Sequence, residues 1–264
     1  GAIGDGVLFE ASVEGKAYAI DARTGDLLWE KDIADDEHAG NAGPLLYHNG
    51  LVYVGLSSVE AFLSAKDRDL EPDFRGQVMA LDARTGDIAW QADLVNEPSN
   101  GVPVRGGFAL DPDMGENGTL FFATGSNLTG RASALSDSVV AVDARTGELA
   151  WYRQTIAGDV WTARNPEGPG FGFTAPPQLF DPTVGGERRT LVGVGQKSGV
   201  FHVFDRADGE PVWEAHVGYG NIGGGVTAAA AGGRDRVLAR GNNSVAFREP
   251  EPRHITFGYA RLAD

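Results

Sequence analysis

The chain has 264 residues, no cysteine and a formal net charge of −15, because 37 acidic residues stand against 22 basic ones. This composition excludes a disulfide scaffold, a thiolate zinc site and a cysteine nucleophile, and an acidic chain lacks the basic surface that nucleic acids or anionic membranes require. No apolar run is long enough to span a membrane. Lysine is scarce beside this excess of acids, a balance typical of proteins that stay soluble at high salt.

One motif recurs four times along the chain. Residues 21–29 read DARTGDLLW, residues 82–90 and 143–151 are close copies, and residues 205–213 are a looser one. The tryptophans that end these copies are 61, 61 and 62 residues apart. Self-similarity at a fixed period is the mark of a repeat architecture, so the whole chain is predicted to consist of one repeated unit.

Each unit is predicted to contain four strands. Apolar residues alternate with polar ones before each motif, which indicates a strand there, and the Gly of each motif closes a hairpin into a strand that ends at the Trp. These strands before the motif are expected over 15–21, 76–82, 137–143 and 199–205. Further strands are expected upstream, over 6–11, 51–55, 120–124, 191–194 and 237–239, preceded by first strands such as 43–47 and 177–180.

A repeated four-stranded antiparallel unit with a Trp at one fixed place predicts an all-β fold, a β-propeller of four-stranded blades. The alternative, a stack of separate hairpins, would bury no shared core. Residues 1–264 are interpreted as a single propeller domain, with blade units ending near Trp29, Trp90, Trp151 and Trp213 and a partial blade over 214–264. The fold is therefore expected to be a partial propeller of four to five blades.

The two ends and three long loops break the pattern. The chain is expected to begin inside a blade whose first strand, before Gly6, is missing, and residues 259–264 read as the start of another motif copy. Either the two ends share one blade, or the chain is part of a longer one, because an open arc exposes sheet edges. Loops 56–75, 126–136 and 152–176 are expected to gather on one face and to carry function.

The pattern of Ala19, Asp21, Thr24, Gly25 and Trp29 resembles the tryptophan-docking motif of pyrroloquinoline quinone (PQQ) propellers. That family includes quinoprotein alcohol dehydrogenases and an outer-membrane assembly scaffold. The loops are similar to those of the polyvinyl-alcohol dehydrogenase branch, in the same order along the chain. The segments that carry this similarity are 54–60, 74–76, 123–127, 159–161, 168–180 and 195–199.

The resemblance implies an extracytoplasmic enzyme that oxidises a small or polymeric alcohol by hydride transfer to PQQ, beside a divalent metal, usually Ca²⁺. By position, Arg75, Arg105 and Lys197 are the candidates for binding the cofactor, and Glu60 and Asn127 for binding the metal. Other interpretations stay open: Glu60 as a solvated loop acid, Arg75 as part of a surface ion pair, and Asn127 as the head of an Asn-Leu-Thr glycosylation sequon.

Several residues depart from the family pattern. Arg105 stands where a Trp should form the floor under the quinone, and Gly172 stands where the catalytic base is expected. The family's cysteine pair is replaced by residues 71–72, and another funnel acid and aromatic by residues 227–228. The resemblance therefore implies a dehydrogenase-like propeller with a degraded site. The alternative is a non-catalytic propeller that serves as a binding or scaffold module, with a protein or further blades as its partner.

Other polar clusters carry weaker signals. The acidic run 35–37 is predicted to be a solvated loop, with a cation site as the alternative, and residues 111–115 are predicted to be a hairpin turn. The five histidines show no metal-ligand spacing, and His202 is expected to lie in a strand, either packed or exposed at its edge. The triple glycine at 223–225 precedes no helical pattern, so it is not expected to bind phosphate.

Overall fold

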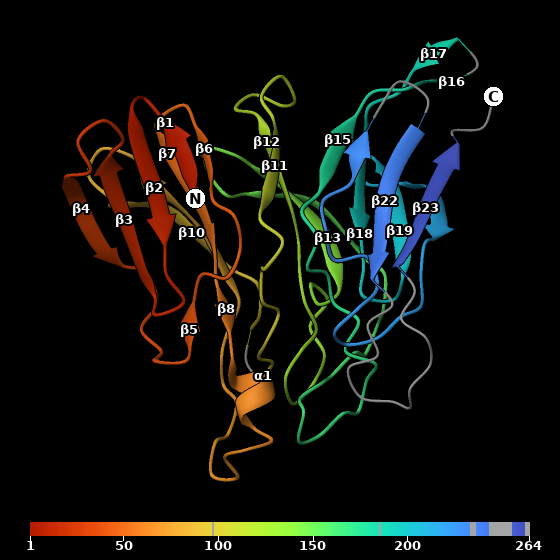
Figure 1. Ribbon diagram of the computed structural model, residues 1–264, viewed down its shortest axis with the longest axis horizontal. Coiled ribbons are helices and arrows are strands. Elements are labelled where there is room, and N and C mark those ends of the chain that lie inside the picture. Colours follow the sequence, from red (N-terminus) through yellow and green to blue (C-terminus); the bar gives the residue numbers. More distant parts are fainter. Residues whose placement is uncertain (97, 185, 233–235, 243–254, 262–264) are drawn as a thin grey trace.

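The computed structural model describes residues 1–96, 98–184, 186–232, 236–242 and 255–261. Figure 1 shows these parts as a row of β-sheets that follow one another from the N-terminal end, in red, to the C-terminal end, in blue. The described residues contain one short helix, α1 (Glu60–Leu63), and no helix long and apolar enough to cross a membrane. The predicted all-β class is confirmed.

Four sheets of four antiparallel strands make up most of the described structure, in agreement with the predicted repeat. The first comprises β1 (Ala2–Gly4), β2 (Val7–Ala11), β3 (Lys16–Asp21) and β4 (Leu27–Asp32), and the second β6 (Leu46–His48), β7 (Leu51–Gly55), β9 (Gln77–Asp82) and β10 (Ile88–Asp93). The third comprises β11 (Phe108–Asp111), β12 (Thr119–Ala123), β13 (Ser138–Asp143) and β14 (Leu149–Gln154), and the fourth β15 (Gln178–Phe180), β18 (Leu191–Gly195), β19 (Val200–Asp205) and β20 (Pro211–His216).

The remaining strands form smaller sheets. The strands β21 (Ala231–Gly232), β22 (Arg236–Asn242) and β23 (Ile255–Arg261) follow the fourth sheet, and two short pairs join β5 (Ala39–Gly40) to β8 (Ser57–Ser58) and β16 (Thr183–Val184) to β17 (Glu187–Arg188). The predicted next motif copy, over 259–264, falls partly on residues 262–264, which lie outside the described residues.

The first sheet corrects one expectation, because it lacks no strand. β1 precedes Gly6 and pairs with β2, with Ala2 opposite Phe9 and Gly4 opposite Val7. A tight turn joins the two strands: Asp5 and Gly6 both adopt positive φ, at 49° and 79°. Asp-Gly is a preferred sequence for such a hairpin, so Asp5-Gly6 indicated a turn here. The strand before it was not predicted because β1 is short and contains a glycine.

Each motif copy forms the turn that the sequence predicted. In the first copy, Oδ1 of Asp21 accepts hydrogen bonds from the amides of Arg23 and Thr24, at 2.8 and 2.9 Å. Gly25 then adopts a φ of 80°, which favours glycine. The second and third copies repeat both features, so the Asp and the Gly of the motif are fixed by the geometry of the turn.

The tryptophans of the motif join each sheet to the next. Nε1 of Trp29 donates to the carbonyl oxygen of Ala83 at 3.0 Å, a residue of the following motif copy. Trp90 and Trp151 bond in the same way, to Ala144 at 3.1 Å and to Arg206 at 3.1 Å. The predicted docking role is thereby confirmed for these three residues. Nε1 of Trp213 has no hydrogen-bond partner among the described residues.

The apolar core lies between neighbouring sheets. Phe121 and Phe122 are adjacent on β12 and point to opposite faces, yet both are fully buried. Phe122 joins a cluster with Val78 of the second sheet, while Phe121 joins one with Val192 of the fourth. Sheets buried on both faces explain why β12 and β13 are apolar at nearly every position, and they match the stacking of propeller blades.

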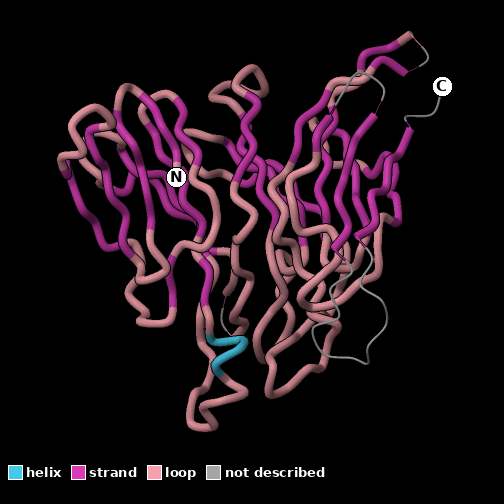
Figure 2. The backbone as a smooth tube through the Cα atoms, viewed as in Figure 1, coloured by secondary structure: helices cyan, strands magenta, loops and turns pink. Residues whose placement is uncertain are grey.

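The long loops gather on one side of the sheets, as expected. In Figure 2 the strands occupy the upper part of the view, while the loops and α1 extend below them. The first of these loops, over 56–75, contains β8 and α1, and the third begins only after β14 ends at Gln154. Residues 111–115 form the predicted turn between β11 and β12.

Candidate functional site

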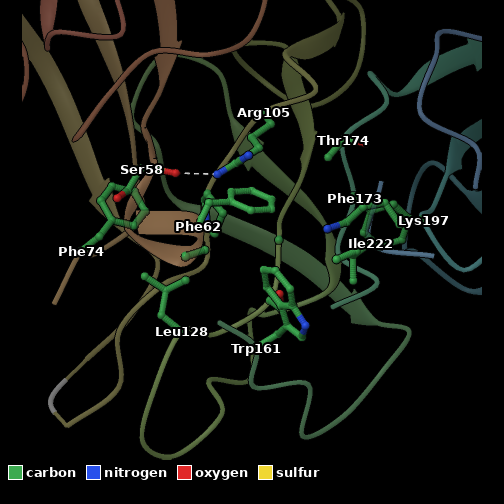
Figure 3. Close-up of a pocket in the computed structure, with 14 residues that line it drawn as sticks. Ser58, Phe62, Phe74, Arg105, Leu128, Trp161, Phe173, Thr174, Lys197 and Ile222 are labelled. Atoms are coloured by element: carbon green, nitrogen blue, oxygen red, sulfur yellow. Dashed lines mark hydrogen bonds between the residues drawn. The ribbon is translucent and has the colours of Figure 1, made fainter. Parts of the chain in front are cut away.

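Loops from successive sheets enclose one cavity of about 90 Å³. The cavity lies beyond the C-terminal ends of β7, β12 and β18. Each of these is the second strand of its four-stranded sheet and leads into a loop. Figure 3 shows the side chains that line it. The lining comprises Ser58, Ala61, Phe62, Phe74, Pro103, Arg105, Gly125, Ser126, Leu128, Trp161, Phe173, Thr174, Lys197 and Ile222.

Two cations reach into this cavity. In Figure 3 the nitrogen-bearing ends of Arg105 and Lys197 point into the same space. Nη2 of Arg105 donates to the carbonyl oxygen of Ser58 at 2.5 Å, and burial lowers the pKa of its guanidinium. Burial lowers the pKa of Lys197 to about 8, and the positive charge of Arg105 acts in the same direction. The sequence placed both residues at the cofactor, and the structure brings them together.

A pair of acids lies buried close to Lys197. Asp137 and Asp159 are both fully buried, and their charges oppose the lowering of the pKa of Lys197. Asp159 accepts hydrogen bonds from the amides of Gly170, at 2.9 Å, and Phe171, at 2.8 Å. No described donor bonds to either carboxyl oxygen of Asp137. Burial, reinforced by the carboxylate of Asp159, raises the pKa of Asp137 to about 9, so that it holds a proton at neutral pH.

Sequence reasoning did not assign these two acids to the site. The strand pattern predicted Asp137 only as the first residue of a strand, and its φ of 51° is unusual for a residue other than glycine. The signals available were a short run of small polar residues over 136–138 for Asp137, and the family-like segment 159–161 for Asp159. The aromatic lining residues Phe62 and Trp161 were also missed, because loop aromatics show no periodicity that indicates where they point.

Glu60, predicted to bind a metal, does not line the cavity. Its side chain is buried, with 1% exposed, and burial raises its pKa. Its carboxylate accepts hydrogen bonds from the amides of Phe74 and Asp73, at 2.9 and 3.3 Å, and from the hydroxyl of Ser58 at 3.2 Å. Glu60 therefore fixes its own loop, and the interpretation as a solvated acid is wrong. Its carboxylate also lies within 4.8 Å of those of Asp36 and Asp73, outside the cavity lining.

Asn127, the second predicted metal ligand, also lies outside the cavity lining. It is fully buried, its Nδ2 donates to the carbonyl oxygen of Asn100 at 2.6 Å, and its Oδ1 accepts from the amide of Ser133 at 2.7 Å. An amide engaged on both sides holds the loop together, and its burial leaves it inaccessible to glycosylation. Its neighbour Ser126 lines the cavity instead.

The remaining two predicted positions are Arg75 and Gly172. Arg75 is exposed and is not among the lining residues, and its backbone forms a parallel bridge with Gly101. Gly172 is packed against backbone, since a Cβ atom there would lie 2.5 Å from Cα of Gly125 and 2.7 Å from the amide nitrogen of Ser126. No side chain fits at residue 172 unless the backbone moves.

The cavity suits an anion better than a metal ion. Among its described lining residues there are two cations and three hydroxyl-bearing side chains, but no carboxylate. Calcium prefers carboxylate and carbonyl oxygens, and two adjacent cations repel it. The residues present therefore do not fit a calcium ion beside a ligand in this cavity.

Comparison with known proteins finds relatives that align with most of the chain. The family described as the beta-propeller domain of glucose/ethanol/alcohol dehydrogenase matches residues 119–218. Polyvinylalcohol dehydrogenase of Sphingopyxis sp. (strain 113P3) is 31% identical over 258 residues, which cover 88% of this chain and 39% of that protein. A second polyvinylalcohol dehydrogenase, from Pseudomonas sp., is 30% identical, with coverage of 84% of this chain and 37% of that protein.

A solved structure supports the fold. That of quinohemoprotein alcohol dehydrogenase ADHIIG from Pseudomonas putida HK5 matches with a TM-score of 0.64 and 26% identity, and it covers 80% of this chain and 33% of that one. The chain thus spans less than half the length of the relatives it matches. The docking tryptophans, the four-stranded sheets and these similarities together establish that the chain belongs to the PQQ-type (quinoprotein) β-propeller family.

Proposed function

We propose that this chain is a dehydrogenase-like propeller module that binds an anionic ligand in its cavity and does not oxidise alcohols by hydride transfer to a quinone. One observation carries the proposal: Gly172, which by resemblance stands where the family has its catalytic base, is packed so closely against backbone that no side chain fits there. A base that takes the alcohol proton typically contributes about 10²- to 10⁴-fold to the rate, so its absence removes a large part of the catalysis.

The enzymatic interpretation rests on the relatives, which are named as polyvinylalcohol and quinohemoprotein alcohol dehydrogenases. In that interpretation Arg75, Arg105 and Lys197 would hold PQQ, and Glu60 and Asn127 would hold Ca²⁺. Arg105 and Lys197 line the cavity and suit an anion, while the other three lie outside its lining. Arg105 and Lys197 remain at the cavity, whereas Glu60 and Asn127 lie outside its lining and Gly172 offers no base. This combination favours ligand binding without catalytic turnover.

The proposal also covers the location of the protein, the salt content of its medium and its partner. The resemblance implies a location outside the cytoplasm, the net charge of −15 suits a saline medium, and the partner is a protein or further blades. A scaffold role is the second candidate function, and the absence of the base favours it over catalysis.

The test is an activity assay after loading. The purified chain is incubated with PQQ and CaCl₂, desalted, and mixed with primary alcohols, polyvinyl alcohol and a redox dye. A quinohemoprotein alcohol dehydrogenase treated in parallel shows that loading and dye reduction work. We expect no alcohol-dependent reduction of the dye by the chain. Reduction that depends on alcohol, PQQ and Ca²⁺ together would overturn the proposal.

A further inference from the structure

The described lining of the cavity carries two cations and no carboxylate. In the described part of the chain, Nζ of Lys197 has no hydrogen-bond acceptor and no ion-pair partner, and Arg105 bonds only to the neutral carbonyl of Ser58. Two cations that face one space repel each other, which is an unfavourable arrangement unless an anion joins them. Cations held in this way are typical of a binding site for a negatively charged group.

The nearby acids do not provide that anion. Asp137 is fully buried and is not among the residues that line the cavity, and burial favours its protonated form. Asp159 accepts hydrogen bonds from the amides of Gly170 and Phe171 and is not among the residues that line the cavity. Since the described lining residues include no carboxylate, an anionic ligand is the group that would pair with both cations inside the cavity.

A large part of the wall is formed by apolar side chains, and some of these are partly exposed. Phe62 of α1 is 47% exposed, although it packs edge-on against Trp161 with ring centroids 5.5 Å apart and an interplanar angle of 64°. Leu128 lies near Phe62 in Figure 3, while Ile222 lines the cavity beside Lys197. An exposed aromatic side chain at the mouth of a cavity is a surface that an apolar ligand would remove from water.

We propose that the cavity binds a small carboxylate that bears a single apolar ring, with the carboxylate between Arg105 and Lys197 and the ring against Phe62 and Trp161. This inference rests on the proposed function, binding without turnover, and adds the class of ligand. Sites for drug-sized ligands usually measure roughly 300–1,000 Å³. A cavity of about 90 Å³ therefore favours one ring over a fused polycyclic ligand.

The polar groups also select a carboxylate. The planar fork of an arginine matches a carboxylate, and a lysine adds a point charge. Oγ1 of Thr174 is buried at the cavity with no hydrogen-bond partner among the described residues, so it is available as a further donor. A neutral ring compound would leave both cations unpaired, and a simple inorganic anion would leave Phe62 exposed to water.

The experiment is calorimetric titration of the whole chain with benzoate, with benzyl alcohol and acetate as controls that lack the charge or the ring. We expect saturable binding of benzoate that is about tenfold or more tighter than that of either control. Benzyl alcohol or acetate binding as tightly as benzoate would overturn the proposal, as would the absence of benzoate binding.

Variants test the residues. Lys197→Met keeps the apolar stem of the side chain and should weaken benzoate binding about tenfold, while Lys66→Met, at an exposed lysine, should leave it unchanged. Phe62→Ala, at a half-exposed position, should weaken benzoate without weakening acetate. Thermal melting confirms that each variant is folded, and equal loss in both lysine variants would contradict the site.

The two proposals fail in different ways. Alcohol-dependent dye reduction by the chain loaded with PQQ and CaCl₂ would overturn the proposed function, whatever benzoate does. A failure of benzoate to bind, with no dye reduction, would overturn only the ligand class.

Discussion

The guanidinium of Arg105 and the ammonium of Lys197 face one cavity, and the charge of Arg105 helps to hold the pKa of Lys197 at about 8. Burial is the larger cause, and Asp137 and Asp159 act in the opposite direction. Because opposing effects set the pKa of Lys197, a change in the charge of any of these neighbours should shift that pKa. The pKa of Lys197 therefore reports on the charge of the whole site.

Replacing Arg105 should raise the pKa of Lys197. In Arg105→Gln the repulsion between the two cations is lost while Asp137 and Asp159 remain, so the protonated form of Lys197 becomes more favourable. Reductive ¹³C-methylation of the lysines, followed by NMR at increasing pH, measures this directly, because the chain has few lysines and their signals are resolvable. Arg84→Gln, at an exposed arginine, is the matched control and should leave the titration unchanged. An unaltered pKa in Arg105→Gln would show that the two groups do not interact.

The buried carboxyl of Asp137 should make the fold less stable as pH rises. Its pKa of about 9 in the folded chain lies above the ordinary value of 3.8. Between those values the folded state binds a proton that the unfolded state has released, so stability is fully present below the lower value and is lost as pH rises toward the higher one. Each pH unit in this window lowers the free energy of unfolding by about 1.4 kcal/mol. Lys197 contributes in the opposite sense only above about pH 8.

Asp137→Asn isolates this effect, since it keeps the shape and removes the ionisation. Urea unfolding from about pH 5 to about pH 8 should show a smaller decline for the variant than for the natural chain, with the variant the more stable at the upper end. Asp113→Asn, at an exposed acid, serves as the control and should follow the natural chain. Parallel declines in all three proteins would mean that Asp137 is ionised when buried.

The fold could be predicted from sequence because its signals are local and repeated. The Asp of each motif bonds to amides two and three residues ahead, the Gly takes the positive φ, and the Trp docks on the next copy of the same turn. The hairpin of β1 was missed although Asp5-Gly6 marks it, because three residues are too few to show a period of two. The repetition of the motif indicated the fold where a single segment was too short to do so.

The site was predictable only in part. Arg105 and Lys197 were predicted by position, and both line one cavity, but nothing in the local sequence around Glu60 and Asn127 fixed where those two side chains point. Those two side chains bond to nearby loop backbone, an alternative that short polar side chains in loops always offer. The burial of Asp137 depends on long-range packing, which no local pattern reports.

Gly172 should not tolerate the acid that the resemblance implies at this position. Gly172→Asp would force a side chain against the backbone of Gly125 and Ser126 and bury a charge. We expect a loss of stability above about 4 kcal/mol, or failure to fold, because overpacking and charge burial add. Gly158→Asp is the matched control: its Cβ would meet nothing within 4 Å, and its φ of 76° is one that Asp tolerates. Chemical denaturation compares the two, and similar costs would show that position 172 has room for a base.

High salt should stabilise the chain. A net charge of −15 on a folded surface favours unfolding by self-repulsion, which added salt screens. The melting temperature should rise by several degrees between about 0.1 M and about 1 M NaCl. Sucrose solutions, which add no ions, control for effects on water. A melting temperature independent of NaCl would contradict the predicted saline adaptation.

The docking hydrogen bond should be measurable as a difference between two tryptophans. Trp90→Phe removes the donor to the carbonyl of Ala144 and leaves that buried acceptor unpaired, at an expected cost of about 1–3 kcal/mol beyond the lost ring area. Trp213→Phe loses similar area but no hydrogen bond to a described residue, so it should cost less. Urea unfolding of both variants gives the comparison. Trp90→Phe costing no more than Trp213→Phe would mean that ring packing alone, without the indole N–H, joins one sheet to the next.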